Sequence, residues 1–430
     1  MSVVVTESSL PVVLYGTEIG DLVEVDGRTL LRWSAAAEER WGLNSSVLSR
    51  HLRVGRSDVD RTESFFGALL PEGNLLETLA RELRVSSSDL RGLLAAVGGD
   101  LAGALVIGGE QVPAAPERLT EAQIGELLRT ANGYLVGGGG SALPGFQRKL
   151  TLSLRDGEWY RGNGTWPSTH ILKPVALEYR SAVDAEAYCL QLARAVGLAG
   201  YESWVEVIAG HPTLVVERYD RAGAQRDQRL HQEDGAQALG LPWGGNDKFE
   251  QVNPQASLRS IARAVDTRGT ALTGVFDRLK LVRYVTFNVA VGNTDAHAKN
   301  FSLLHAEDGE SRLAPLYDVA PLALDYANGT TMAMRVNGKL QLPDVTVDDI
   351  VSEARSWGVP DSVARTAAVE TLEALVEATR DSEAPLSIES HAPGYVRGQA
   401  MNLLDGRAAR IVSAVPLTSL PRLGTPQPRE

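Results

Sequence analysis

The chain has 430 residues, of which 43% are apolar, so it is long enough for two or three domains with buried cores. Its 54 acidic residues outnumber its 42 basic ones, and the net charge of −12 argues against non-specific electrostatic binding to nucleic acid. One cysteine, Cys189, excludes an internal disulfide and a multi-cysteine zinc site, and it fits a small apolar position on a helix. Neither a signal peptide nor a convincing membrane span is visible. We therefore expect a cytoplasmic protein that does not enter a membrane and contacts DNA only indirectly.

Residues 1–112 are predicted to form a small α+β unit. Apolar and turn residues alternate between positions 2 and 31, which is typical of short antiparallel strands. Four apolar residues then fall at helical spacing between Phe65 and Leu70, and helical segments are expected from 77 to 97. The prolines and small residues of 112–117 indicate a linker.

Residues 118–244 are predicted to form a twisted antiparallel sheet with one helix packed on it. The expected strands are 149–154, 169–174, 204–209 and 213–219. The expected helix covers 183–198, where apolar residues recur every three positions.

Residues 245–415 are predicted to form a second, mostly helical lobe. Helices are expected at 258–265, 275–291 and 363–378. Residues 416–430 hold four prolines and no helical periodicity, which indicates a loose tail. The predicted class is therefore α+β, with two lobes and a small N-terminal subdomain.

Asp295 and Asn300 stand five positions apart, directly after an apolar helix that ends at Gly292. Protein kinases use this spacing in their catalytic loop, where the Asp accepts the proton of the attacking hydroxyl and the Asn helps to hold magnesium. Asp and Asn are also favoured in ordinary turns, so the pair alone leaves both interpretations open.

Asp318 strengthens the kinase interpretation. It lies eighteen residues after Asn300 and follows a strand-like segment, where a kinase keeps its second metal carboxylate. No Phe-Gly follows it, so the activation switch of ordinary protein kinases is not expected.

Lys173 ends the apolar segment that begins at Ile171, from which a positive charge would reach nucleotide phosphates. Glu186, on the helix that follows, could orient this lysine by an ion pair. A surface lysine and a surface glutamate remain the alternatives.

The glycine-rich segment 137–145 is the candidate phosphate cradle, because glycine lets backbone N–H groups approach an anion. It is not a Walker A loop, since Phe146 and Gln147 stand where Lys and Ser or Thr are required. Residues 213–220 form an apolar strand that ends in charged residues. In a kinase this is the hinge, where Glu217 and Tyr219 would bind adenine through their main chain.

Together these segments resemble the HipA family, the kinase toxins of bacterial toxin–antitoxin modules. The motifs that carry the resemblance span most of the chain and occur in order at 65–73, 93–105, 143–149, 169–174, 216–221, 231–240, 292–302 and 316–321. The resemblance implies a two-lobed serine/threonine kinase that uses ATP and Mg²⁺.

The resemblance also implies roles for individual residues. Asp295 and Lys173 would be catalytic, and Asn300 and Asp318 would bind magnesium. Residues 231–234 would lie near the edge of the nucleotide. The nucleotide-binding set would be Gly145, Gln147, Lys149, Lys173, Glu186, Glu217, Tyr219, Asp220, His297 and Lys299.

One position departs from the family pattern. Members are silenced by autophosphorylation of a serine three residues before the loop glycine, but that position before Gly145 is Ala142. Either Ser141 takes the role in a shifted register, or the chain is not silenced in this way, or Ala142 is an engineered change.

Partners are implied by the resemblance alone. They are a small dimeric helix-turn-helix antitoxin of the HipB type, operator DNA reached through it, and a protein substrate such as an aminoacyl-tRNA synthetase, whose phosphorylation would inhibit translation. Two alternatives stay open. One is a weak or inactive kinase that serves as a corepressor with the antitoxin, and the other is a kinase that acts on a small molecule.

Overall fold

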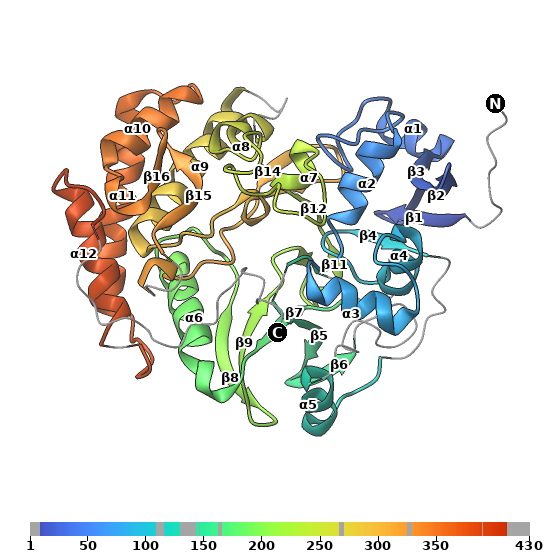
Figure 1. Cartoon of the computed structure of the whole chain (residues 1–430), viewed down its shortest axis with the longest axis horizontal. Coiled ribbons are helices and arrows are strands. Elements are labelled where there is room, and N and C mark those ends of the chain that lie inside the picture. Colours follow the sequence, from blue (N-terminus) through green and yellow to red (C-terminus); the bar gives the residue numbers. More distant parts are fainter. Residues whose placement is uncertain are drawn as a thin grey trace.

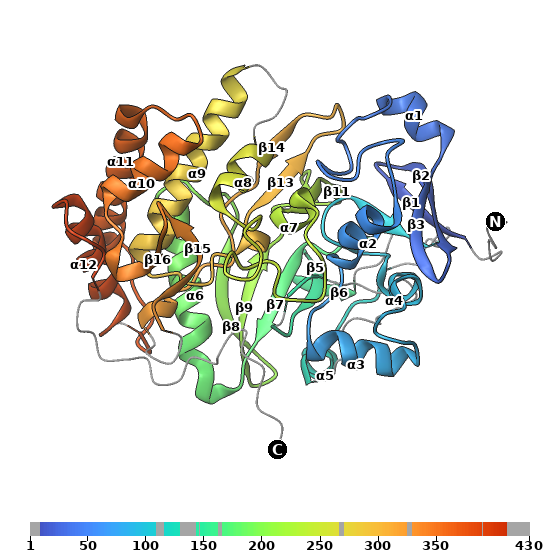
Figure 2. The ribbon, with the colours of Figure 1, turned by 45° about the horizontal axis from the view of Figure 1, so that its top comes forward.

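The computed structural model describes residues 9–108, 116–129, 143–145, 147–161, 166–265, 271–324, 329–388 and 390–410. Three groups of elements follow one another along the chain and lie side by side in space (Figure 1, Figure 2). The N-terminal group is blue, the sheet of the middle group is green, and the helices of the C-terminal group are yellow to red.

The N-terminal subdomain is an antiparallel sheet in the order β3-β2-β1-β4. Helices pack on it because its inward-facing residues, such as Val12, Leu22 and Leu31, are fully buried. The helix of Phe65 and Phe66 ends at Gly67, so Leu69 and Leu70 follow it rather than extend it. The elements are β1 (Leu10–Leu14), β2 (Thr17–Val25), β3 (Arg28–Trp33), β4 (Leu105–Ile107), α1 (Ala35–Trp41), α2 (Val59–Gly67), α3 (Asn74–Leu83) and α4 (Leu90–Val97).

The middle group is an antiparallel sheet in the order β6-β5-β7-β9-β8, and it confirms the sheet predicted from the sequence. Helix α6 packs on β8 and β9 through buried residues that include Cys189, which is 0% exposed. This cysteine is therefore part of the core. The elements are α5 (Glu121–Arg129), β5 (Leu150–Arg155), β6 (Glu158–Arg161), β7 (His170–Pro174), the 3₁₀ turn Leu177–Tyr179, α6 (Arg180–Ala195), β8 (Ser203–Ile208) and β9 (His211–Glu217).

The C-terminal group is built around α9, against which α10, α11 and α12 pack. It contains more strand than the sequence predicted, because β12 pairs with β13 and β13 with β14, and β15 forms a hairpin with β16. Strand β12 precedes position 245 in the chain yet pairs within this group. None of the helices that the structure describes is long and apolar enough to cross a bilayer.

The bounds of these elements are as follows: β10 (Arg221–Ala222), β11 (Gln228–Arg229), β12 (His231–Asp234), α7 (Gly235–Leu239), α8 (Leu258–Ala264), α9 (Ala271–Val291), β13 (Ser302–His305), β14 (Ser311–Leu313), β15 (Thr331–Val336), β16 (Lys339–Gln341), α10 (Val347–Ser356), α11 (Asp361–Asp381), α12 (Ala392–Leu404) and the 3₁₀ turns Ala298–Asn300, Leu322–Leu324 and Leu342–Asp344.

A buried ionic network joins the N-terminal subdomain to the middle group. The carboxylate of Asp100 accepts hydrogen bonds from Arg221 at 3.0 Å, Arg229 at 3.1 Å and the backbone N–H of Ser168 at 3.1 Å. Arg218 lies 3.7 Å from the same carboxylate. Because Asp100 is 1% exposed, water cannot replace these partners. The network fixes the two units relative to each other.

Replacing Asp100 with alanine is expected to destabilise the protein by about 3–5 kcal/mol, because it removes the buried carboxylate that three arginines share. Urea unfolding followed by circular dichroism measures the change. The matched control is Asp60→Ala, which removes an ion pair to Arg28 from a side chain that is 86% exposed and should change stability by about 0.5 kcal/mol or less. Equal shifts in the two variants would contradict the prediction.

Candidate active site

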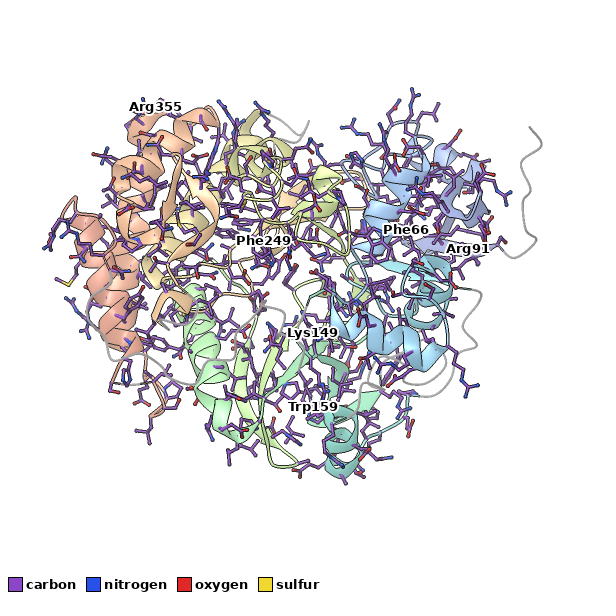
Figure 3. All side chains as sticks on the ribbon, in the orientation of Figure 1. Phe66, Arg91, Lys149, Trp159, Phe249 and Arg355 are labelled. Carbon is purple, nitrogen blue, oxygen red and sulfur yellow. The ribbon has the colours of Figure 1, made fainter. Side chains whose placement is uncertain are left out.

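A cleft of about 200 Å³ lies where the five-stranded sheet meets the C-terminal group. All three groups of elements contribute to its lining, for example Glu72, Lys173 and Asp295. Figure 3 shows Lys149 and Phe249, which line the cleft from opposite sides, below and above the centre of the view. The cleft is therefore a site that no single group of elements forms alone.

Lys173 makes the central contact of the cleft. It projects from β7, and its Nζ atom lies 2.6 Å from a carboxylate oxygen of Glu186 on α6 and 2.6 Å from one of Asp318. Burial alone would lower the pKa of Lys173, but the two carboxylates outweigh burial and raise it, so the lysine is charged. The structure thus brings together three residues that the sequence proposed for one site.

Asp318 lies in the left-handed backbone region, with φ at 54°. Non-glycine residues adopt this conformation rarely, and such residues gather at functional sites. Its side chain is 42% exposed and faces the cleft, while Lys173 and then Lys149 outweigh the effect of burial and hold its pKa below the usual range. The strand expected just before it is wrong, because β14 ends at Leu313 and residues 314–317 form no regular element.

The loop that carries Asp295 begins where α9 ends. Gly292 has φ at 81°, and a Cβ atom there would lie 2.5 Å from the hydroxyl of Tyr395, so only glycine fits this helix end. Asn293 then accepts a hydrogen bond from the N–H of Asp295 at 3.3 Å. The side-chain N–H of Asn300 donates to the backbone carbonyl of Asp295 at 2.9 Å. These bonds hold the two predicted residues next to each other.

The electrostatic surroundings of Asp295 raise its pKa to about 7. Burial is the largest cause, Lys248 opposes it, and the negative charges of Asp318 and Glu72 add to it. A carboxyl group poised near neutrality suits a general base.

Of the glycine-rich segment 137–145 the structure describes Leu143, Pro144 and Gly145, and Gln147 lies two residues beyond it. Lys149 donates a hydrogen bond to the carbonyl of Pro144 at 2.7 Å, and burial, followed by repulsion from Lys173, lowers its pKa to about 8. Gly145 has φ at 119° and lies against the N-terminal subdomain through a bridge to Pro71. Ser141 and Ala142, with the glycines at 137–140, lie outside the described residues.

The expected hinge contains residues that already have partners. The N–H of Glu217 donates to the carbonyl of Glu202 at 2.9 Å, so this group is not available to a nucleotide. Asp220 is 2% exposed and accepts bonds from Arg218 at 2.7 Å and from the N–H of Gly103 at 2.7 Å. Tyr219 follows β9 and lines the cleft, where its hydroxyl donates to Gln232.

The two remaining predicted residues also line the cleft. The ring of His297 meets that of Phe249 edge to face at 5.3 Å, and burial, followed by the charge of Lys248, lowers its pKa to about 3. Lys299 points toward the N-terminal subdomain, with its Nζ atom 3.0 Å from Asp234 and 3.1 Å from the carbonyl of Ala68. Of residues 231–234, Gln232 and Asp234 line the cleft, whereas His231 is buried against the carbonyl of Leu48.

The cleft also contains an ion pair that was not predicted. Glu72 and Lys248 form an ion pair at 2.8 Å, and both line the cleft with Asp295. Lys248 lies between turn residues, and the sequence around it shows no motif or periodicity that would indicate a functional residue. Glu72 belongs to the motif 65–73, but nothing in its local sequence indicates a contact 176 residues away.

Comparison with known protein families agrees with this architecture. The model for the HipA-like C-terminal domain matches residues 141–381, which is more than half of the chain. The chain belongs to the HipA family. The model for the HipA N-terminal domain matches residues 10–108, so both characteristic parts of the family are present.

Curated relatives and solved structures extend this result. The protein Y4mE of Sinorhizobium fredii is 35% identical over 336 residues, which cover 74% of this chain and 78% of that protein. The serine/threonine-protein kinase toxin HipA of Shewanella oneidensis is 28% identical over 325 residues, which cover 71% of this chain and 73% of the toxin. The Shewanella oneidensis HipA structure, solved with HipB and operator DNA, superposes with a TM-score of 0.76 at 21% identity over 93% of this chain and 97% of that chain. The predicted fold class, a two-part kinase-like fold with an extra N-terminal subdomain, is confirmed.

The raised pKa of Asp295 predicts that the folding stability of this HipA-family protein, without ligand, decreases as the pH rises. The ordinary pKa of Asp is about 4, so the folded state disfavours ionisation, and stability present below pH 4 is lost as the pH rises through about 7. Asp295→Asn should therefore raise the melting temperature by roughly 2–4 °C at pH 8, with a gain that shrinks toward pH 4.

Differential scanning fluorimetry of both proteins from pH 4 to pH 8 measures this gain. The control is Asp308→Asn, which changes an exposed carboxylate of a surface loop. A gain at Asp295 that does not depend on pH would contradict the prediction.

Proposed function

We propose that this protein is a serine/threonine protein kinase of the HipA toxin type that uses ATP and Mg²⁺. The observation that carries the proposal is the meeting of Lys173, Asp295, Asn300 and Asp318 in one cleft. Phosphoryl transfer needs this combination of a cation for the phosphates, a base and metal ligands, whereas a scaffold has no need for all four. Family membership and the kinase toxin from Shewanella oneidensis support the same conclusion.

In this proposal ATP lies along the cleft with its phosphates toward Lys173. Glu186 holds the lysine ammonium at 2.6 Å from the side opposite the phosphates. Gly145, Gln147 and Lys149 complete the phosphate end. Adenine would lie at the end of β9 beside residues 217–219, where the N–H of Glu217 already donates to Glu202 and does not contribute. The site would also be lined by four further residues, of which only some would contact the nucleotide: Tyr219, Asp220, His297 and Lys299.

The residues present fit a magnesium ion. Asp318 offers a carboxylate that is 42% exposed in the cleft, and Asn300 offers an amide oxygen while its nitrogen is held by Asp295. Hard oxygen ligands are what Mg²⁺ prefers, and phosphate oxygens and water complete its shell in kinases. When bound, the ion would neutralise charge on the phosphates.

The transfer step follows from the position of Asp295. The oxygen of the acceptor hydroxyl attacks the γ-phosphorus, and the bond from that phosphorus to the β,γ-bridging oxygen breaks. The acceptor proton passes to the carboxylate of Asp295, and ADP leaves with the electron pair of the broken bond. Lys173 stabilises the phosphates throughout.

Lys173→Ala and Asp318→Asn should each lower phosphate transfer by about 10²-fold or more, because each removes charge stabilisation in a buried cleft. Purified protein is incubated with Mg²⁺ and γ-labelled ATP, alone and with a cell lysate, and incorporated label is counted. EDTA should abolish the label, and added Mg²⁺ should restore it.

Asp295→Ala is the reference for absent transfer, and Asp60→Ala, which changes an exposed carboxylate of the N-terminal subdomain, is the control for normal transfer. If the wild type labels neither itself nor any lysate protein, and Asp295→Ala behaves identically, the kinase proposal fails.

The proposed biological role is that of a toxin held inactive by a small helix-turn-helix antitoxin. The Shewanella oneidensis HipA structure contains HipB and operator DNA. This chain has a net charge of −12, so we propose that it too reaches operator DNA through such a partner. An aminoacyl-tRNA synthetase is the proposed substrate class, and its phosphorylation would inhibit translation and promote dormancy.

A phosphoproteome recorded after induction tests the substrate. New phosphoserine or phosphothreonine on a protein supports the proposal, whereas a phosphorylated metabolite without protein targets would favour a small-molecule kinase. Operator binding with antitoxin that is unchanged by alanine at Lys173 or Asp295, without toxicity of the wild type, would favour a corepressor. Phosphopeptides that cover Ser141 would show whether it replaces the serine missing at Ala142.

A further inference from the structure

The segment that follows α2 contacts two loops that line the cleft. The N–H of Glu72 donates to the carbonyl of Gly145 at 3.2 Å, and Pro71 forms the neighbouring bridge to Gly145. The side chain of Glu72 extends in the other direction, toward the loop of Asp295. One short segment of the N-terminal subdomain therefore touches both the candidate phosphate loop and the candidate catalytic loop.

The carboxylate of Glu72 lies between two lysines. Its Oε2 atom is 2.8 Å from Nζ of Lys248, and its Oε1 atom is 3.4 Å from Nζ of Lys299. The exposed fractions of these side chains are 9%, 5% and 11%, so little water is present to compensate either lysine. Burial would raise the pKa of Glu72, but Lys299 and Lys248 lower it to about 2, so the carboxylate stays charged.

Both lysines are attached to the loop of Asp295. Lys299 belongs to the loop itself. Lys248 accepts a hydrogen bond from the N–H of Ala298 at 3.1 Å through its backbone carbonyl, and the ring of its neighbour Phe249 packs on His297. Lys248 also lines the cleft beside Asp295 and opposes the rise of its pKa. Glu72 therefore contacts both ammonium groups, at 2.8 Å for Lys248 and 3.4 Å for Lys299, and Asp234 also holds Lys299 at 3.0 Å.

We propose that Glu72 is a positioning residue for phosphoryl transfer, which holds the loop through Lys299 and directs Lys248 into the cleft beside Asp295. The inference rests on the proposed function and adds a part to it. The N-terminal subdomain becomes a component of the active site, because it supplies the carboxylate that contacts both Lys248 and Lys299, and Asp234 shares only Lys299.

The geometry explains why a carboxylate is needed. A charged oxygen on each side of one carbon can fix two ammonium groups at once, and charge-assisted bonds are stronger and shorter than neutral ones. A glutamine has the same shape but offers one neutral acceptor and one NH₂ donor, which repels an ammonium group. Glu72→Gln should therefore release at least one lysine without changing the packed volume.

The first experiment measures the loop directly by hydrogen exchange of the full-length, ligand-free protein. In Glu72→Gln the amides of residues 295–300 should exchange about tenfold faster, while those of α9 keep the wild-type rate. The matched control is Glu63→Gln, which removes a carboxylate of the same subdomain that binds Arg28 at 2.6 Å and the N–H of Thr29 at 2.9 Å. It should leave the loop unchanged.

The second experiment measures turnover with MgATP. Glu72→Gln should lower kcat by about 10²-fold and change the KM for ATP by about threefold or less, because misplacement of the loop affects the transfer step more than nucleotide binding. Lys248→Met should give a similar loss. The kcat of the double variant should be no lower than that of the less active single variant, since both changes break the same interaction.

Loop exchange and turnover in Glu72→Gln that match the wild type would overturn the inference, as would losses that multiply in the double variant. Faster exchange throughout α9 would show general destabilisation and would also overturn it. A wild type that transfers no phosphate would refute the proposed function, whereas the exchange experiment would still decide whether Glu72 fixes the loop.

Discussion

The arrangement of the cleft depends on the buried ammonium group of Lys173. It contacts Glu186 and Asp318 at 2.6 Å each. Glu186 comes from helix α6 of the middle group, and Asp318 comes from a loop of the C-terminal group. A buried lysine without partners would lose its charge, and the buried carboxylate of Glu186 without a cation would be costly. The three groups therefore stabilise one another across the junction of the sheet and the C-terminal group, where Asp318 and Asp295 line the same cleft.

Buried polar groups tie the N-terminal subdomain to the rest of the molecule. Asp100 binds arginines that follow the five-stranded sheet of the middle group. In the C-terminal group, Glu233 of β12 accepts hydrogen bonds from Ser49 of the subdomain at 2.6 Å and from His305 of β13 at 2.9 Å. Buried polar contacts have strict geometric demands, so they define one relative orientation. That orientation is what allows Glu72 to reach the loop of Asp295, and it explains how a separate subdomain can serve an active site.

Much of the fold and the central site could be predicted from the sequence. Local periodicity identified the antiparallel sheets and the long helix before Gly292, because side-chain spacing follows secondary structure. The spacing between Asp295 and Asn300 is set by one short loop, so it can be recognised directly in the sequence. Lys173 and Asp318 were identified because each belongs to a motif of its own. The residue roles themselves stay predictions, since the structure shows proximity and charge.

What the sequence by itself determined is therefore local: the elements, the catalytic-loop spacing and the family. Only the tertiary structure decided which residues share the cleft. It placed Asp220 in an arginine network, used the N–H of Glu217 for sheet pairing, and joined Glu72 to Lys248 across 176 positions. The reason is physical, because burial and ion pairing depend on distances in space, and residues that are far apart in the chain leave no periodic pattern to mark their contact.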